Sequence, residues 1–90
     1  MTSTPRTYTL VVLRTAKRAI ARLPQATRSR VVQAIDTLVI VPRPVGCVKL
    51  AGPGDRYRVR VGDYRILYEV RDGELVVTVV RVGHRRDVYR

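Results

Sequence analysis

The chain has 90 residues and a formal net charge of +11, from 18 Lys and Arg against 7 Asp and Glu. This length predicts one domain spanning residues 1–90. A single cysteine and a single histidine exclude a disulfide framework and leave too few ligands for a zinc centre. No apolar run approaches the length of a membrane span, so we expect no membrane partner. The single cysteine fits a protein of the reducing cytoplasm. The excess of positive charge indicates a polyanionic partner, most often nucleic acid, with an acidic protein as the second possibility.

The N-terminal half predicts one strand and two helices. Residues 8–13 are rich in β-forming side chains and predict the first strand. Thr15 can cap a first helix, which Pro24 ends. A second helix is expected over residues 25–39, and Pro42 prevents its continuation. The apolar stripe of the first helix is Ala16, Ala19, Ile20 and Leu23, and that of the second is Val31, Val32, Ala34, Ile35, Leu38 and Val39.

Residues 45–55 are expected to form a loop, because they contain three glycines and a proline. Gly52 and Gly54 match no phosphate-binding fingerprint, since the strand, loop and helix context of such motifs is missing. We therefore expect no cofactor.

Residues 57–70 predict a β-hairpin. Apolar side chains alternate with Arg58 and Arg60, which is the period of a half-buried strand. A glycine in the first position of Gly62-Asp63 suits a type II′ turn. The expected cross-strand pairs are Val61 with Tyr64, Arg60 with Arg65, Val59 with Ile66 and Arg58 with Leu67.

One face of this hairpin is expected to join the core, and the other to carry Arg58, Arg60 and Arg65 close together. Like charges directly opposite each other destabilise a hairpin, so stability alone does not explain Arg60 facing Arg65. A polyanionic ligand would explain the arrangement. A solvated strand face in an arginine-rich chain explains it equally well, and the hairpin alone leaves both readings open.

The remaining chain predicts a second turn and a last strand. Asp72-Gly73 is typical of a type I′ turn. Residues 75–82 are strongly β-prone and apolar on both faces, so we expect this strand to lie between other strands or under the helices. A basic tail with Tyr89 follows. The predicted fold is α+β, a small antiparallel β-sheet packed against an N-terminal αα-hairpin, in the order β-α-α-β-β-β.

Two stretches give the chain a family resemblance. They are Tyr57-Arg58-Val59-Arg60-Val61-Gly62-Asp63-Tyr64-Arg65-Ile66-Leu67-Tyr68 and Val82-Gly83-His84-Arg85-Arg86-Asp87-Val88-Tyr89. With Lys49-Leu50-Ala51-Gly52 before the hairpin, they resemble the RelE/ParE superfamily of toxins from bacterial type II toxin–antitoxin systems. The resemblance implies the same small sheet packed on two helices. The RelE branch cleaves messenger RNA in the ribosomal A site, whereas the ParE branch poisons DNA gyrase.

The resemblance also implies which residues act. The positions that match the working residues of RelE-like toxins are Arg58, Arg60, Arg65, Arg85 and Tyr89. All five hold compatible side chains, which favours RNA cleavage over gyrase binding. We also expect Lys49, Arg56, His84 and Arg86 to bind substrate. The implied activity is that of a metal-independent, ribosome-dependent endoribonuclease.

The sequence leaves the general base open. Strand positions that are often lysine in the family are arginine here, and arginine is a poor base because it stays protonated. Arg60 would then only stabilise negative charge on the phosphate. The proton of the 2′-OH would go to ribosomal RNA, to Tyr89 or to His84. Histidine is suited to that role because its pKa lies near neutral pH.

The implied partners are a cognate antitoxin, the ribosome with its 16S RNA, and messenger RNA. The toxin–antitoxin complex is expected to bind operator DNA through the antitoxin. Two alternatives stay open: a ParE-like inhibitor of gyrase, and a nucleic-acid-binding module without catalysis.

Overall fold

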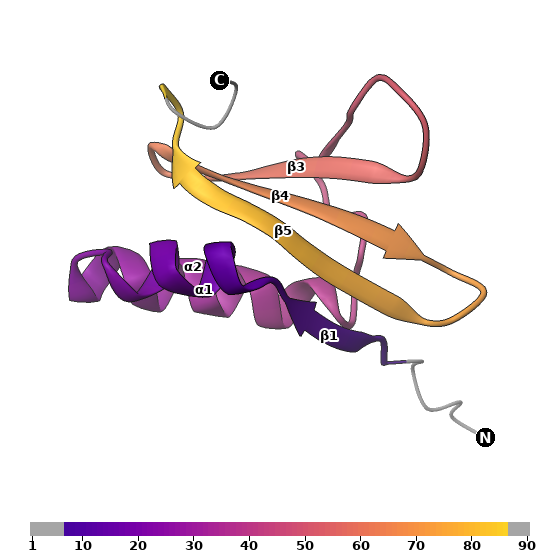
Figure 1. Ribbon diagram of the computed structural model, residues 1–90, viewed down its shortest axis with the longest axis horizontal. Coiled ribbons are helices and arrows are strands. Elements are labelled where there is room, and N and C mark those ends of the chain that lie inside the picture. Colours follow the sequence, from indigo (N-terminus) through magenta and orange to yellow (C-terminus); the bar gives the residue numbers. More distant parts are fainter. Residues whose placement is uncertain (1–6, 87–90) are drawn as a thin grey trace.

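The computed structural model describes residues 7–86, which form two helices and five strands (Figure 1). In chain order they are β1 (Thr9–Val12), α1 (Arg14–Ala21), α2 (Gln25–Leu38), β2 (Val48–Lys49), β3 (Arg56–Val61), β4 (Tyr64–Arg71) and β5 (Val76–His84). Within this part of the chain, neither helix is long and apolar enough to cross a membrane.

The strands form one sheet in the order β1-β5-β4-β3-β2. The α+β class and the order β-α-α-β-β-β are confirmed, but the sheet is mixed rather than wholly antiparallel. β1 runs parallel to β5, with Thr9 opposite Val76 and Val12 opposite Val79. Parallel neighbours need a long crossover between them, and the helices and the β3–β4 hairpin together supply it.

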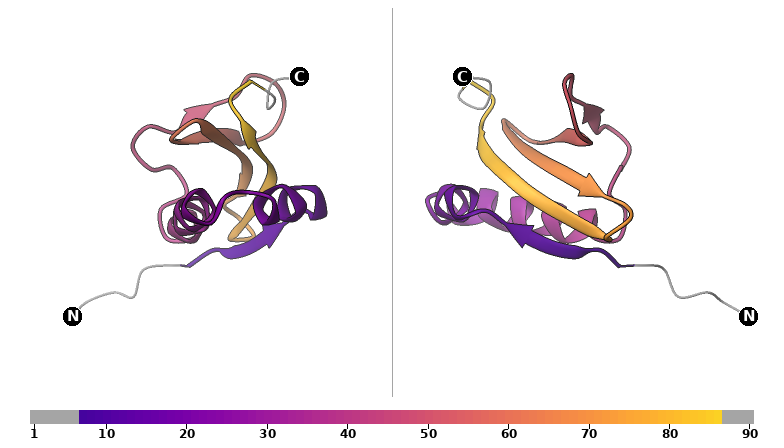
Figure 2. Two further views of the ribbon diagram at one scale, coloured as in Figure 1. Left: turned by 90° about the vertical axis from the view of Figure 1, so that its left-hand side faces the viewer. Right: turned by 45° about the vertical axis from the view of Figure 1, so that its right-hand side comes forward.

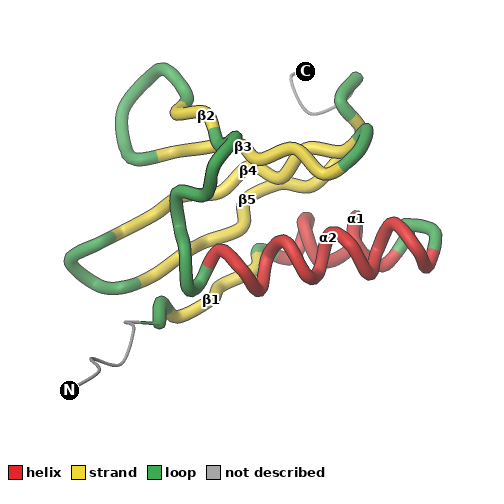
Figure 3. Tube along the Cα trace, turned by 180° about the vertical axis from the view of Figure 1, so that it is seen from behind, coloured by secondary structure: helices red, strands yellow, loops and turns green. Residues whose placement is uncertain are grey.

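The expected loop over residues 45–55 contains a short edge strand, which corrects the prediction. β2 pairs with β3 through Val48 opposite Arg58 and Lys49 opposite Tyr57, and the Leu50 amide donates to the Arg56 carbonyl at 2.8 Å. Figure 3 shows β2 at the edge of the sheet, between the loops that precede and follow it. A strand of two residues is too short to show an alternating pattern, and the glycines and proline around it predict a loop.

Both helices lie against one face of the sheet, where the core forms (Figure 2). The buried side chains are Ala16, Val31, Ile35, Leu38, Tyr57, Ile66, Tyr68, Val70, Val77, Val79 and Val82. Four residues of the predicted stripes are buried in this core: Ala16, Val31, Ile35 and Leu38. Four others are partly buried and pack against it: Ala19, Ile20, Leu23 and Ala34. Val39 is half-buried, and Val32, at 40% exposed, does not belong to the core. Thr15 does not cap α1 as predicted, because the cap position is Leu13 and no side chain bonds there.

The turn between β4 and β5 also differs from the prediction. Arg71 pairs with Val76, so four residues connect the strands instead of the two of a type I′ turn. The Leu75 amide donates to the Asp72 carbonyl at 3.2 Å, and Leu75, rather than Gly73, adopts the left-handed conformation with φ 54°.

Candidate functional site

The β3–β4 hairpin has the predicted register. Arg60 lies opposite Arg65 and Arg58 lies opposite Leu67. Gly62 has φ +59°, and Asp63 does not have a positive φ, which agrees with the predicted type II′ turn. We call the face of the sheet that is turned away from the helices the open face. The side chains of Arg58, Arg60 and Arg65 lie on it, because their neighbours along each strand face the core.

These three arginines line a pocket of about 190 Å³ together with Gly46 and Val48, which we call the arginine pocket. Arg60 Nε donates to the Gly62 carbonyl at 3.1 Å, and Arg65 Nη1 donates to the Tyr64 carbonyl at 3.3 Å. Each of these hydrogen bonds uses one donor of a guanidinium that has five. The remaining donor capacity and the concentrated charge make this pocket suited to a phosphate group.

A carboxylate neutralises the other part of the open face. Glu69 accepts from Arg71 Nε at 2.9 Å and from Arg56 Nε at 3.4 Å. The hydrogen bonds from Arg71 and then Arg56 lower the pKa of Glu69. Arg56, one of the expected substrate-binding residues, therefore lies on the open face but is paired within the protein.

Lys49 does not join the arginine pocket. Its ammonium lies 3.5 Å from the Asp55 carboxylate. Lys49 pairs with Tyr57, whose ring is buried on the opposite face, while its neighbour Val48 borders the pocket. Lys49 thus points away from the three arginines.

His84 is also separated from the arginine pocket. It pairs with Tyr64, and the two rings meet edge to face with centroids 5.6 Å apart. Since Tyr64 belongs to the core face, His84 lies on that side of the sheet. The His84 Nδ1 accepts from the Arg86 amide at 3.3 Å.

Arg85 lies next to the hairpin turn, because its amide donates to the Asp63 carbonyl at 2.8 Å. This bond brings the segment after β5 to the end of the sheet that carries Arg60 and Arg65. The remaining expected catalytic residue, Tyr89, lies outside the described residues.

The structure adds Arg81 to the open face, which the sequence did not indicate. The register between β4 and β5 shifts between Leu67 and Tyr68, and one extra residue, Val80, enters β5. Without this bulge Arg81 would face the helices; with it, Arg81 lies opposite Leu67, in the same row as Arg58. Arg81 also borders α1 at the free edge of β5. A single charged residue in an otherwise apolar strand was the only signal in the sequence.

Arg30 of α2 is a second addition near the hairpin turn. Its Nη1 would lie 3.6 Å from a Cβ built on Gly62. Arg30 is exposed, as its place outside the apolar stripe predicted, but its side chain reaches the turn between Arg60 and Arg65.

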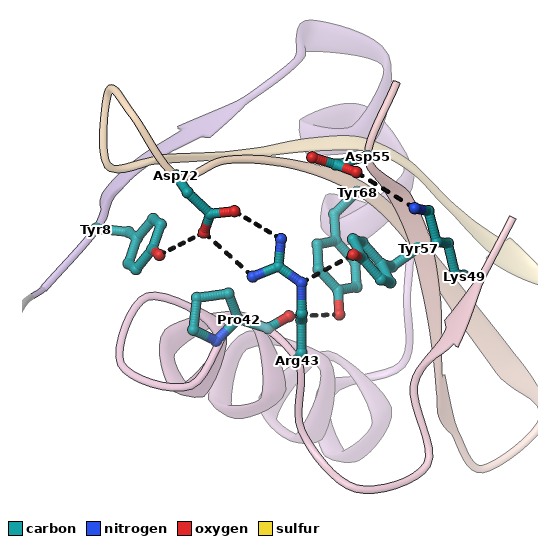
Figure 4. A network of polar contacts seen from close by, with 8 residues as sticks. All are labelled: Tyr8, Pro42, Arg43, Lys49, Asp55, Tyr57, Tyr68 and Asp72. Atoms are coloured by element: carbon teal, nitrogen blue, oxygen red, sulfur yellow. Dashed lines mark hydrogen bonds and ion pairs between the residues drawn. The ribbon is translucent and has the colours of Figure 1, made fainter. Parts of the chain in front are cut away.

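Arg43 forms the centre of a polar network beside the core (Figure 4). Its Nη2 and Nη1 donate to the two Asp72 carboxylate oxygens at 2.8 and 3.1 Å, and its Nε donates to the Tyr57 hydroxyl at 2.8 Å. The Tyr8 hydroxyl donates to Asp72 at 2.7 Å. These bonds tie the loop after α2 to β3, to the β4–β5 turn and to the residue before β1.

The network predicts an acid-dependent loss of stability. Hydrogen bonds from Arg43 and then Tyr8 lower the pKa of Asp72 to about 2, against about 3.9 in an unfolded chain. A carboxyl whose folded pKa is depressed stabilises the fold fully above its unfolded pKa, and this contribution is lost as the pH falls through the folded value. We expect Asp72→Asn to melt at a lower temperature than wild type at pH 6, with the difference shrinking between pH 4 and pH 2.

Thermal melts over that pH range check this expectation. Asp36→Asn, on the exposed face of α2, is the charge-matched control and should follow the wild-type curve. A constant difference between Asp72→Asn and wild type down to pH 2 would contradict the assignment.

Metal ligands do not gather in the part of the chain from residue 7 to residue 86: no three His, Cys, Asp or Glu side chains there are placed to hold an ion.

Comparisons with known proteins agree on one family. The family model for the ParE toxin of type II toxin–antitoxin systems, parDE, matches residues 10–89. Toxin RelG of Mycobacterium tuberculosis is 34% identical over 84 residues, which cover 92% of this chain and 97% of that toxin. In the archaeal RelE–RelB complex from Pyrococcus horikoshii, the matching chain has a TM-score of 0.81 and 31% identity, covering 91% of this chain and 99% of that one. The isolated RelE toxin of E. coli gives a TM-score of 0.75 and 29% identity, and the match covers 91% of this chain and 90% of that toxin.

The chain belongs to the RelE/ParE superfamily of toxins of type II toxin–antitoxin systems. Its fold is RelE-like, as the hairpin and the C-terminal motif predicted.

Proposed function

We propose that this toxin is a ribosome-dependent endoribonuclease that cleaves messenger RNA in the A site and thereby inhibits translation. The observation that supports this proposal is the arginine pocket, in which Arg58, Arg60 and Arg65 meet around a space of about 190 Å³. The similarity to RelE and RelG toxins adds support.

The arginine pocket fits the electrostatic demand of RNA cleavage. In this reaction the ribose 2′-OH attacks the adjacent phosphate, and negative charge grows on the phosphoryl oxygens. Arg58 and Arg65 would hold that charge with their planar forks of donors, and Arg60 would add to the field. As the bond from phosphorus to the 5′-oxygen breaks, Arg85, next to the turn, would stabilise the charge on that leaving oxygen, and a water molecule would supply its proton.

The proton from the 2′-OH needs another acceptor. Arginine stays protonated and cannot take it, and His84 lies on the other face of the sheet beside Tyr64. We therefore assign this step to Tyr89 or to the ribosomal RNA. In either case the ribosome would align the codon against the arginines, and catalysis depends on it for this positioning.

This dependence predicts the behaviour of the purified toxin. Free messenger RNA should be cut slowly, and programmed ribosomes should raise the rate by orders of magnitude, because positioning alone supplies effects of that size. The cut should fall within the A-site codon. The measurement is single-turnover cleavage with and without ribosomes, with the 3′ ends mapped. Equally fast, metal-dependent cutting of free RNA would rule the mechanism out.

The proposed protein partner is a cognate antitoxin. The matched structures from P. horikoshii and E. coli include RelE–RelB complexes. On this toxin, a groove of about 400 Å³ between α1, α2 and β1 is mainly apolar and is bordered by two basic side chains, Lys17 and Arg28, and one acidic side chain, Asp36. An amphipathic segment with acidic side chains would fit it, ordering as it binds. Through such an antitoxin the complex would bind operator DNA.

Gyrase inhibition is the second candidate function, because the matching family model is that of ParE toxins. A ParE-like toxin would act by binding a protein and would need no catalytic pocket. The pocket with three converging arginines therefore favours RNA cleavage.

A further inference from the structure

The loop between α2 and β2 connects the Arg43 network to the arginine pocket. At its start, the Pro42 carbonyl accepts a hydrogen bond from the Tyr68 hydroxyl at 2.7 Å, and Arg43 binds Asp72 and Tyr57. The guanidinium of Arg43 also lies over the Tyr57 ring, 5.1 Å from its centroid. The start of the loop is thus held by two tyrosines and a carboxylate.

The other end of the loop forms a wall of the arginine pocket. Gly46 and Val48 line it together with the three arginines, and Val48 pairs with Arg58 in the sheet. Only two residues, Pro44 and Val45, separate Arg43 from Gly46. The Cys47 amide donates to the Pro44 carbonyl at 3.1 Å, which folds this short span into a turn.

Arg43 is therefore connected to the arginine pocket through two separate segments of the chain. It fixes the loop that carries Gly46, and it fixes Tyr57, whose chain neighbour is Arg58. A lysine could keep the charge at this position but could not bind two carboxylate oxygens and a hydroxyl at once, because it lacks the planar fork.

We propose that the loop from Pro42 to Val48 is a substrate-positioning wall, and that Arg43 is the positioning residue that sets its distance from the arginines. The wall closes the pocket on one side, so that a phosphate group of single-stranded RNA is held against Arg58 and Arg65. This inference rests on the proposed function for the identity of the substrate. Loosening the wall should weaken substrate binding more than it slows the chemical step.

Two glycines allow a matched test of the wall. Gly46 has φ +92° and Gly54 has φ +86°, and a Cβ at either position meets no atom within 4 Å. Alanine in this left-handed region strains the backbone similarly at both sites. Only Gly46 lines the pocket. Gly46→Ala and Gly54→Ala should therefore lower the melting temperature alike, and only Gly46→Ala should disturb the wall.

The experiment measures four quantities for wild type, Gly46→Ala, Gly54→Ala and Arg43→Lys. These are the melting temperature, KM and kcat on programmed ribosomes, and the affinity for a short fluorescent single-stranded RNA. We expect Gly46→Ala and Arg43→Lys to raise KM and weaken RNA binding about tenfold, with kcat changed far less, since small displacements of positioning groups have effects of this order. Gly54→Ala should match wild type in KM and in RNA affinity.

Equal RNA affinities and equal KM values for Gly46→Ala and Gly54→Ala would overturn the proposal. A fall in melting temperature alone for Arg43→Lys would reduce Arg43 to a structural residue and would also overturn it. If wild type does not cleave at all, the nuclease function fails. The difference in RNA affinity between the two glycine variants then still decides whether the wall positions a polyanion.

Discussion

Arg65→Ala is expected to lower the rate of messenger RNA cleavage on programmed ribosomes by about 100-fold or more, the usual cost of removing one donor that stabilises developing charge. The fold should tolerate the change. Arg65 lies directly opposite Arg60, so its removal relieves a repulsion, and surface changes of this kind alter stability by less than about 0.5 kcal/mol. Single-turnover cleavage, with thermal melts run beside it, is the measurement.

The control is Arg18→Ala, which removes the same charge from an exposed position of α1, and both helices lie on the side of the sheet away from the open face (Figure 2). Arg30 is unsuitable as a control, because its guanidinium reaches the hairpin turn at Gly62. Arg18→Ala should leave cleavage nearly intact. Equal losses in the two variants would mean that the arginines supply only a general electrostatic attraction, and the nuclease assignment would then be abandoned.

Expression of the toxin alone is expected to arrest growth, and co-expression with its antitoxin is expected to restore it. The physical reason is that an acidic antitoxin, anchored in the groove between α1, α2 and β1, would extend round to the basic open face of this toxin of charge +11 and exclude RNA. The adjacent reading frame should encode a small acidic protein, and the two should purify together.

Failure of that frame to rescue growth, together with failure to co-purify, would contradict this pairing.

The hairpin could be predicted from the sequence because its information is local. Alternation fixes which side chains share a face, and a glycine at the first turn position fixes the register of every pair that follows. Arg60 opposite Arg65 was therefore visible without a structure.

Features that depend on distant parts of the chain could not be predicted in the same way. β1 joins β5 in parallel because the chain between them acts as one crossover, which no local pattern reveals. Arg81 reaches the open face through a bulge at Val80, inside a mainly valine run where alternation does not show which side chains face the core. Arg43 and Asp72, which bind each other, are 29 residues apart in the sequence, so no local pattern connects them. Asp72 stands before Gly73, and this pair by itself predicts only a type I′ turn.

The order in which macromolecular synthesis stops in cells tests the central claim most directly. After a short induction of the toxin, cells are pulsed with labelled methionine and labelled thymidine, and an SOS reporter is followed. An endoribonuclease that acts in the ribosomal A site predicts that methionine incorporation falls first, with no SOS response. Early loss of thymidine incorporation with SOS induction, while protein synthesis continues, would contradict the account and favour gyrase as the target.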